Sequence, residues 1–392
     1  MKISVKSVFI LLICSLVGCS PKMNQSHSNF KAAMESVLKN QVLEEAAWAM
    51  QQEPITISAS LCSRSAGGKN DFYSEGDYWW PDTNNLEAPY IQKDGLTNPD
   101  NFVTHRLSMI RFSKIIGALA SAYKITGDIK FVQQAELHLN AWFINEQTKM
   151  NPNLQFAQAI KGRFTGRGIG IIDTIHLMEV AQGTLVMQDK MKSESLSQIK
   201  KWFTDYLSWM MTSSNGIEEM SAKNNHGTCF VMQIASFAKF TGDFTLMQFC
   251  SNRFKQVLLP NQMAENGSFP LELARSKPYG YSIFNLDAMT AICQIISTKT
   301  DNLWQYKTAE GKNIKTAIVY LHSYIADKSK WTLQPDVMYW KDWPVAQPAF
   351  LFGAITFEQK DWFATWKRLE HQPKVQEVIR NLAIKNPIIW LE

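Results

Sequence analysis

The chain has 392 residues, which is enough for one large domain or two smaller ones. A hydrophobic fraction of 45% and an aromatic fraction of 12% support a large buried core and exclude a disordered chain. The net charge of +5 falls to +3 without Lys2 and Lys6, and this is too small for the concentrated basic surface of a nucleic-acid-binding protein. It is compatible with an acidic polysaccharide as partner.

The N-terminal segment has the features of a secretory signal: two lysines, then an apolar run at 8–13. The run is too short for a permanent membrane span. The sequence Leu-Val-Gly-Cys at 16–19 is similar to the lipobox of bacterial lipoproteins. We therefore expect a signal peptide at 1–18, a tether at 19–29 that starts with a lipidated Cys19, and a lipid anchor in the bacterial cell envelope, periplasmic or at the cell surface. The alternative is a plain signal peptide with a chance cysteine.

Helical periodicity dominates the rest of the chain, and convincing period-two runs are few. The exception is 58–99, which is rich in turn residues; a loop of this length in a compact domain is usually functional. The expected helices are 30–50, 109–123, 131–142, 169–188, 193–212, 226–240, 244–258, 283–299, 314–326 and 374–384.

A short repeat indicates how the helices connect. Residues 120–128 align without a gap on 235–243, and both end in Thr-Gly-Asp. Glycine suits a left-handed residue after a helix, and aspartate suits the cap of the next one. Helical hairpins joined in this way predict an all-α array, and the absence of a linker predicts a single domain at 30–392.

Two segments carry the chemistry: Asn224-Asn225-His226 and, about fifty residues later, the stretch from Arg275 to Tyr281. Removal of the C5 proton of a uronate adds charge beside its carboxylate, so amide and imidazole donors there stabilise the transition state. A tyrosine phenol can take that proton and return it to the leaving oxygen, and we expect the Arg275 cation to lower its pKa. We therefore expect Asn225, His226, Arg275 and Tyr281 to catalyse β-elimination.

Several other residues are candidates for substrate binding. Tyr78, Trp79 and Trp80 form an aromatic cluster in the long loop, which serves either as a sugar platform or as an anchor to the core. Arg163 and Arg167 lie in a glycine-rich basic stretch that suits carboxylates, although a solvated loop has the same composition. Tyr279, His105 and His176 complete the set. No cysteine or histidine spacing indicates a metal, no cofactor is expected, and Cys62, Cys229, Cys250 and Cys293 are expected to be buried thiols.

A family resemblance rests on several motifs taken together. They are Tyr-Trp-Trp-Pro-Asp at 78–82, Pro-Tyr-Ile at 89–91 with Asp-Gly at 94–95, Asn-Pro-Asn-Leu at 151–154, Gly-Arg at 166–167 with Gly-Ile-Ile-Asp at 170–173, and Asn-Asn-His at 224–226. In this order they resemble the alginate lyase superfamily typified by polysaccharide lyase family 5. The resemblance implies an (α/α) toroid, an incomplete barrel of helical hairpins with an open cleft and no metal. It also implies catalytic roles for Asn225 and His226, with an arginine and a tyrosine further on.

The second segment departs from family 5. Arg-Ser-Lys-Pro-Tyr-Gly-Tyr at 275–281 looks more like polysaccharide lyase family 38, which includes alginate and glucuronan lyases, and by that pattern Tyr281 is the catalytic phenol. A single phenol serves both proton transfers only when the C5 proton and the C4 oxygen leave from one face. This favours mannuronate or glucuronate over guluronate.

Two other functions stay open from the sequence. One is a glycan-binding lipoprotein that has lost catalysis. The other is a glycoside hydrolase, which needs a pair of carboxylates, for which Glu265, Glu272 and Asp287 are available. The oligomeric state cannot be predicted.

Overall fold

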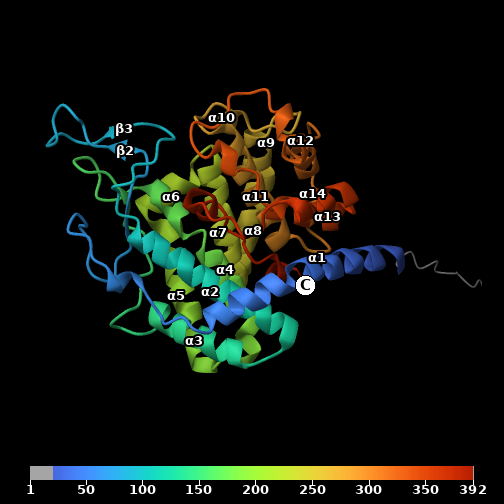
Figure 1. Ribbon diagram of the computed structural model, residues 1–392, viewed down its shortest axis with the longest axis horizontal. Coiled ribbons are helices and arrows are strands. Elements are labelled where there is room, and N and C mark those ends of the chain that lie inside the picture. The colour runs from blue at the N-terminus through green and yellow to red at the C-terminus, as the bar shows by residue number, and fades with distance from the viewer. Residues whose placement is uncertain (1–20, 392) are drawn as a thin grey trace, which may run out of the picture.

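The computed structural model describes residues 21–391, and most of the chain is helical (Figure 1). Five helices form an inner layer in which each packs on the next along the chain. They are α2 (Thr104–Thr126), α4 (Leu177–Met187), α7 (Asn225–Thr241), α11 (Pro278–Ile296) and α13 (Pro348–Phe357). The N-terminal helix α1 (Pro21–Ala49) contacts both α2 and α13, so it lies between the two ends of the inner layer. This is the expected (α/α) toroid.

An outer layer covers the inner helices. Helix α3 packs on α2, α5 and α8 pack on α7, α12 packs on α11 and α13, and α14 packs on α13. The outer helices are α3 (Lys130–Phe143), α5 (Ser193–Thr212), α8 (Phe244–Arg253), α12 (Ile314–Ala326) and α14 (Lys360–Arg368). Nearly every residue of α7 and α11 is buried, whereas α3 buries one stripe that includes Phe131, Leu139 and Trp142. Apolarity on all sides therefore marks the inner helices, and a single apolar stripe marks the outer ones.

The repeated Thr-Gly-Asp turns join inner to outer helices, as the sequence predicts. Gly127 and Gly242 have φ of 71° and 81°, a left-handed conformation that glycine adopts without strain. Their N–H groups donate to the carbonyl oxygens of Tyr123 and Ala238. The Asp243 carboxylate then accepts from the N–H of Leu246 and caps α8.

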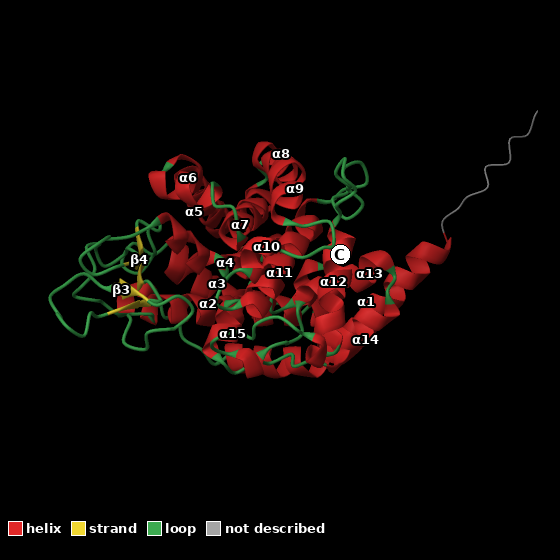
Figure 2. Cartoon of the chain, turned by 90° about the horizontal axis from the view of Figure 1, so that it is seen from above, coloured by secondary structure: helices red, strands yellow, loops and turns green. Residues whose placement is uncertain are grey.

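The strands are short and lie at one end of the molecule (Figures 1 and 2). Strand β1 (Tyr73–Glu75) pairs in parallel with β4 (Phe156–Ala159), and β2 (Trp79–Trp80) pairs antiparallel with β3 (Ile91–Gln92). The β2–β3 hairpin extends away from the helices (Figure 1). The backbone N–H of Tyr90 donates to the carbonyl of Lys161 at 3.1 Å and joins this hairpin to the turn at 160–164. Residues 76–98 and 160–167 are called the lobe below.

Short helices complete the chain. They are α6 (Ser214–Met220), α9 (Leu259–Gln262), α10 (Pro270–Leu273) and α15 (Gln376–Arg380), with 3-10 turns at Ile57–Ala59, Gly168–Thr174, Gln188–Lys190, Lys328–Lys330, Trp340–Asp342 and Pro387–Trp390.

Some expected boundaries are wrong. The tether expected at 19–29 is helical from Pro21 onward, because α1 begins there. The helix expected at 169–188 opens with a 3-10 segment, the one at 244–258 widens into a π-helical turn at Phe254–Leu258, and 374–384 contains only α15. Helices α13 and α14 were not expected, since α13 is apolar on all sides and α14 is short. The signal peptide at 1–18 and Cys19 lie outside the described residues.

Within residues 21–391 no single helix is long and apolar enough to cross a membrane. One bent pair of helical segments, Gly168–Thr174 with Leu177–Lys190, meets the requirement for a membrane span by length and composition alone. Cys62, Cys229, Cys250 and Cys293 are free thiols, and all but Cys62 are buried, close to expectation.

Candidate active site

The first turns of two packed inner helices bring the two motifs together. Asn224 caps α7 by accepting from the N–H of His226, so Asn225 and His226 occupy the first turn. Tyr281 lies in the first turn of α11, and Arg275 precedes that helix. Asn225, His226, Arg275 and Tyr281 all line one pocket of about 100 Å³. The structure therefore places the four expected catalytic residues around one site, at helix ends that favour anions.

Glu272 of α10 fixes the side chain of Asn225. Its two carboxylate oxygens accept from the backbone N–H and from Nδ2 of Asn225, each at 2.6 Å. Burial raises the pKa of Glu272, although both hydrogen bonds act in the opposite direction. The amide has a second N–H, which remains available for a substrate carboxylate.

Glu219 of α6 fixes the ring of His226. Its Oε1 lies 2.7 Å from Nδ1 of His226, and the glutamate side chain is fully buried whereas the imidazole is one-fifth exposed. The other oxygen, Oε2, has no hydrogen-bond partner among the described residues. A carboxylate behind Nδ1 selects the tautomer with the proton on that nitrogen, which leaves Nε2 for the substrate.

Tyr281 is paired with a second phenol and with two cations. Its hydroxyl lies 2.7 Å from the hydroxyl of Tyr78. The guanidinium of Arg275 lies 4.6 Å from the centre of the Tyr281 ring, and Nζ of Lys277 lies 5.4 Å from it. Lys277 also lies over the ring of Tyr78, at 4.9 Å. Two cations therefore face the phenol that we assign to proton transfer.

We expected the Arg275 cation to bring the pKa of Tyr281 below its usual value. The net shift of this pKa is in the opposite direction, so the expectation is wrong. Burial raises the pKa of Tyr281 well above its usual value, and Tyr78 raises it further. Lys277 and Arg275 act in the expected direction but do not outweigh burial. The phenol is therefore protonated at neutral pH in the free protein.

An ion-pair network lies beneath the two phenols. Lys277 pairs with Glu377, and Arg380 pairs with Glu377 and with Asp77 at 2.9 and 2.8 Å. Asp77 also accepts from Arg106 at 2.8 Å. Burial alone would raise the pKa of Asp77, but the two guanidinium groups hold it below its usual value. Asp77 is thus a fixed counter-ion, which makes it a poor acid or base.

The lobe forms the opposite wall of the pocket. Tyr78, Trp79 and Arg167 line it, and the guanidinium groups of Arg163 and Arg167 lie 5.3 and 5.8 Å from the Trp79 ring. Arg163 lies just outside the pocket lining. Trp80 also lies outside it, because its Nε1 donates to the carbonyl of Leu96 and anchors the hairpin. The aromatic cluster thus both faces the pocket and anchors the loop.

The lobe is tied to the helical wall by Asp94. This carboxylate accepts from Arg275 at 3.0 Å and from Ser276 at 2.7 Å. Gly95 has φ of 78°, and a Cβ there would lie 2.4 Å from Oγ of Ser276. The close approach of the lobe at this point therefore requires glycine.

Three further expected binding residues lie in the core, away from the pocket. Tyr279 is fully buried, and its hydroxyl donates to the carbonyl of Tyr324. The ring of His105 accepts from the N–H of Tyr73 and bonds to the carbonyl of Ser60. The buried ring of His176 accepts from Nζ of Lys385. All three hold the core together, so we do not retain them as substrate-binding residues.

The acids considered for a hydrolase do not converge. Glu265 is exposed, Glu272 holds Asn225, and the buried Asp287 accepts from the N–H of Ala349 while burial raises its pKa to about 8. The two carboxylates that line the pocket, Asp77 and Asp94, are both paired with arginine. An acid and base pair for glycoside hydrolysis is not formed by these groups.

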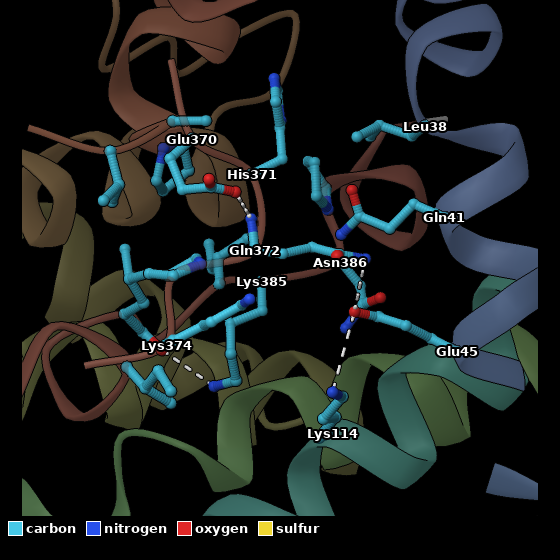
Figure 3. Close-up of a pocket in the computed structure, with 18 of the residues that line it drawn as sticks. Leu38, Gln41, Glu45, Lys114, Glu370, His371, Gln372, Lys374, Lys385 and Asn386 are labelled. Atoms are coloured by element: carbon cyan, nitrogen blue, oxygen red, sulfur yellow. Dashed lines mark hydrogen bonds and ion pairs between the residues drawn. The ribbon is translucent and has the colours of Figure 1, made fainter. Parts of the chain in front are cut away.

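A second cavity, of about 370 Å³, lies between α1 and the C-terminal segment (Figure 3). Both lysines and glutamates line it, and Nζ of Lys114 lies 3.9 Å from Oε1 of Glu45. Burial lowers the pKa of Lys385 to about 8, and its Nζ donates to the carbonyl of Leu382. No tyrosine lines this cavity, and it contains none of the motif residues, so we place the chemistry in the smaller pocket.

Metal ligation is not indicated in the part of the chain that the structure describes. Within residues 21–391, no three histidine, cysteine, aspartate or glutamate side chains are placed to share an ion.

Sequence reasoning missed several residues of the site. Lys277 and Asp94 stand inside quoted motifs, so their position beside Arg275 could have indicated a role. Glu272 was considered only as a hydrolase acid. Glu219 and Arg380 have no local signal, because they reach the site from α6 and α15 only through the fold.

Comparisons with known proteins agree with this geometry. The profile of the family described as alginate lyase matches residues 58–331. An alginate lyase from Bacteroides ovatus is 28% identical, with a TM-score of 0.77, and the match covers 94% of this chain and 97% of that one. Alginate lyase A1-III from Sphingomonas species A1 is 14% identical, with a TM-score of 0.53 and coverage of 83% and 89%.

A variant of alginate lyase A1-III complexed with a tetrasaccharide is 13% identical, with a TM-score of 0.54 and coverage of 83% and 88%. At such identities the likeness to the A1-III structures concerns the fold alone. No curated protein matches this sequence.

Proposed function

The chain belongs to the alginate lyase family and is a polysaccharide lyase, and from this premise we propose that it cleaves a polyuronate by β-elimination. The proposed substrates are mannuronate-rich alginate or glucuronan. The observation that carries the proposal is the convergence of Asn225, His226, Arg275 and Tyr281 on one pocket. The products would be chains with an unsaturated uronate at the new non-reducing end.

In the proposed reaction, the substrate carboxylate binds at the first turn of α7. The free N–H of Asn225 stabilises the charge that develops there when the C5 proton leaves, whereas Nε2 of His226, which carries no proton in the tautomer that Glu219 selects, is placed as an auxiliary base. The phenolate of Tyr281 takes this proton, a C4–C5 double bond forms, and the C4–O bond breaks. The same phenol then returns the proton to the departing oxygen, so the tyrosine is regenerated.

The phenolate needs stabilisation, because burial favours the protonated form of Tyr281. Lys277 and Arg275 are the cations nearest its ring. Their charges are held in place by Glu377 and Asp94, respectively. This support acts on the short-lived phenolate and leaves the resting phenol neutral.

The preference for mannuronate or glucuronate follows from the use of one phenol for both proton transfers. In these sugars the C5 proton and the C4 oxygen leave from the same face, whereas in guluronate they leave from opposite faces. Polyguluronate that is degraded faster than both polymannuronate and glucuronan would move the base role to His226.

A screen with ultraviolet absorbance tests the proposal. The protein is incubated with polymannuronate, polyguluronate, glucuronan and glycosaminoglycans, and the unsaturated uronate is recorded. A rise with polymannuronate or glucuronan is expected. New reducing ends without the absorbance would indicate a hydrolase, and binding without new ends would indicate a non-catalytic glycan-binding protein.

The location is a separate part of the proposal and is supported by the sequence alone. Lipidation of Cys19 would anchor the protein in the bacterial cell envelope, periplasmic or at the surface. Each buried CH₂ of a lipid contributes about 0.8 kcal/mol, and two or more chains attach a protein stably. Cys19→Ala is expected to release the protein into the soluble fraction, and a variant that stays with the membrane would contradict the anchor.

A further inference from the structure

The cavity of about 370 Å³ between α1 and residues 370–387 has the size and the lining of a small-ligand site (Figure 3). Sites for small molecules usually measure roughly 300–1,000 Å³. Side chains from α1, α2, α14 and the start of α13 complete its walls. None of the four proposed catalytic residues lines it, so the lyase reaction does not account for this cavity, which we call the α1 cavity.

A single segment separates the α1 cavity from the catalytic pocket. Ile379 and Leu382 line the α1 cavity, whereas Arg380 and Asn381, which lie between them in the chain, line the catalytic pocket. The two sites are therefore distinct. A ligand in the α1 cavity would nevertheless contact the segment that carries Arg380 to the catalytic side.

A lysine without an acidic partner faces the α1 cavity. Nζ of Lys385 donates to the carbonyl of Leu382 at 2.9 Å and to Nδ1 of His176 at 3.1 Å, which leaves one N–H of the ammonium group. Within residues 21–391, this amine forms no ion pair with an aspartate or glutamate. Burial lowers its pKa to about 8, so it is still charged at pH 7. An anion in the cavity would supply the missing partner.

The backbone beside this lysine is held in place by a buried carboxylate. Glu179 accepts from the N–H groups of Lys385 and Asn386 at 3.0 and 2.9 Å, and its other oxygen accepts from Nδ2 of Asn386 at 2.7 Å. Gly117 of α2 permits this close packing, because a Cβ there would lie 2.3 Å from Nδ2 of Asn386. The lysine is thus positioned before a ligand binds, which reduces the cost of binding.

The rest of the lining suits a hydroxylated body with a single negative charge. Trp48 and Trp366 supply aromatic surface, against which the C–H groups of a sugar ring can pack. Lys114 is a second cation and lies 4.9 Å from the centre of the Trp48 ring. Three carboxylates also line the cavity: Glu44, Glu45 and Glu370. They would repel an anion of higher charge, and they can accept hydrogen bonds from hydroxyl groups.

We propose that the α1 cavity binds a small carboxylic acid with one negative charge and several hydroxyl groups, the chemical class of a free hexuronate. Its carboxylate would pair with Lys385 and Lys114, and its hydroxyl groups would donate to the glutamates. The site is additional to the proposed function and does not depend on it, because its ligand is bound and not cleaved. Binding would also stabilise the segment that carries Arg380.

Calorimetric titration and thermal unfolding test the α1 cavity with D-glucuronate as the probe. D-glucose has the same ring without the carboxylate and is the control ligand. Glucuronate is expected to bind and to raise the melting temperature, and glucose is expected to do neither. Lys385→Met keeps the aliphatic chain and removes the charge, so binding of glucuronate should weaken by about tenfold. Lys114→Met changes a half-exposed side chain, should weaken binding by about threefold, and decides the question if Lys385→Met does not fold.

Two further variants locate the binding. Lys201→Met removes an exposed charge on α5, which lies away from α1 (Figure 2), and should bind glucuronate like the parent protein. Asn225→Ala removes the amide that we assign to the substrate carboxylate in the catalytic pocket. It should also bind glucuronate like the parent, because the α1 cavity is a separate site.

Four results would overturn the proposal. They are no binding of glucuronate, equal binding of glucose, unchanged binding in the folded lysine variants of the cavity, and a loss of binding in Asn225→Ala or Lys201→Met as large as in those variants. Polyuronate turnover by the parent protein is measured in parallel. If the parent cleaves the polymer but does not bind glucuronate in the cavity, only the α1 cavity is wrong; if it binds glucuronate but does not cleave, only the proposed function fails.

Discussion

The two walls of the catalytic pocket are built on different principles. The helical wall takes its residues from the first turns of α7 and α11, and its cations are locked in ion pairs. The lobe takes its residues from short strands and turns, and its cations lie on aromatic rings without acidic partners. Fixed, paired groups suit charge that develops in a transition state, whereas unpaired cations suit a charge that the substrate brings.

This difference assigns separate kinetic effects to the two walls. Variants of the helical wall should lower kcat, because their groups act on charge formed during the reaction. Variants of the lobe should raise KM, because their groups contact the substrate in the ground state as well. A lobe variant that lowers kcat alone, or a variant of the helical wall that raises KM alone, would contradict this assignment of kinetic effects.

The largest effect is expected from Tyr281→Phe. The change keeps the ring under Arg275 and Lys277 and removes the hydroxyl that transfers the proton. We expect kcat to fall by about 10³ or more, with little change in the melting temperature. Tyr279→Phe is the matched control two residues away: it loses one hydrogen bond to a carbonyl in the core and should retain most activity. An inactive Tyr279→Phe with an active Tyr281→Phe would reverse the assignment.

Asn225→Ala should have the next largest effect. It removes the N–H proposed to stabilise the charged carboxylate, so kcat should fall by roughly 10² to 10³. It also removes one of the two donors to the buried Glu272, and thermal unfolding should be recorded with the kinetics. A tenfold rise in KM without a change in kcat would place this amide in ground-state binding.

Glu219→Gln tests the carboxylate behind His226. Glutamine can still accept from Nδ1 but lacks the charge, so kcat should fall by about ten- to a hundredfold, the equivalent of roughly 1.5–3 kcal/mol for a hydrogen bond to a charged group. The pH profile should change as well, which a purely structural role would not produce. Glu194→Gln, at an exposed position of α5, is the control. Parent-like rates and an unchanged profile in Glu219→Gln would remove Glu219 from the mechanism.

Trp79→Ala is expected to have the smallest of these effects. It should change KM, whereas the variants above should change kcat. It removes the ring on which Arg163 and Arg167 both lie. We expect KM for the polymer to rise by about three- to tenfold, the range of one aromatic or cation–π contact, while kcat stays within twofold. A large fall in kcat would show that the lobe also positions the reacting sugar.

The sequence predicts the regular parts of this structure well. The helices expected at 193–212 and 314–326 have those bounds, because each shows one apolar stripe with clear ends. The pairing of Asn225 and His226 with Arg275 and Tyr281 also follows from the motifs. These features are local, so they are visible in a few consecutive residues.

The parts that the sequence does not predict depend on the fold. Glu219 supports His226, and Arg380 lies beneath Tyr78, only because α6 and α15 pack at the site. The pKa of Tyr281 also depends on the fold. The motif contains the nearby cations Arg275 and Lys277, but the sequence does not indicate the burial that outweighs their effect on this pKa. Burial also removes His105, His176 and Tyr279 from the pocket, although their residue types suit a sugar site.

The pH dependence of kcat/KM on polymannuronate or glucuronan tests the central claim, that the Tyr281 phenolate is the base, most directly. Because the pKa of Tyr281 is raised, the phenolate is a minor species at neutral pH, and its fraction grows as the pH increases. The account predicts that kcat/KM rises through the neutral and mildly alkaline range while the fold stays intact by circular dichroism. A kcat/KM that is flat or falls over this range, with Tyr281→Phe still active, would contradict it.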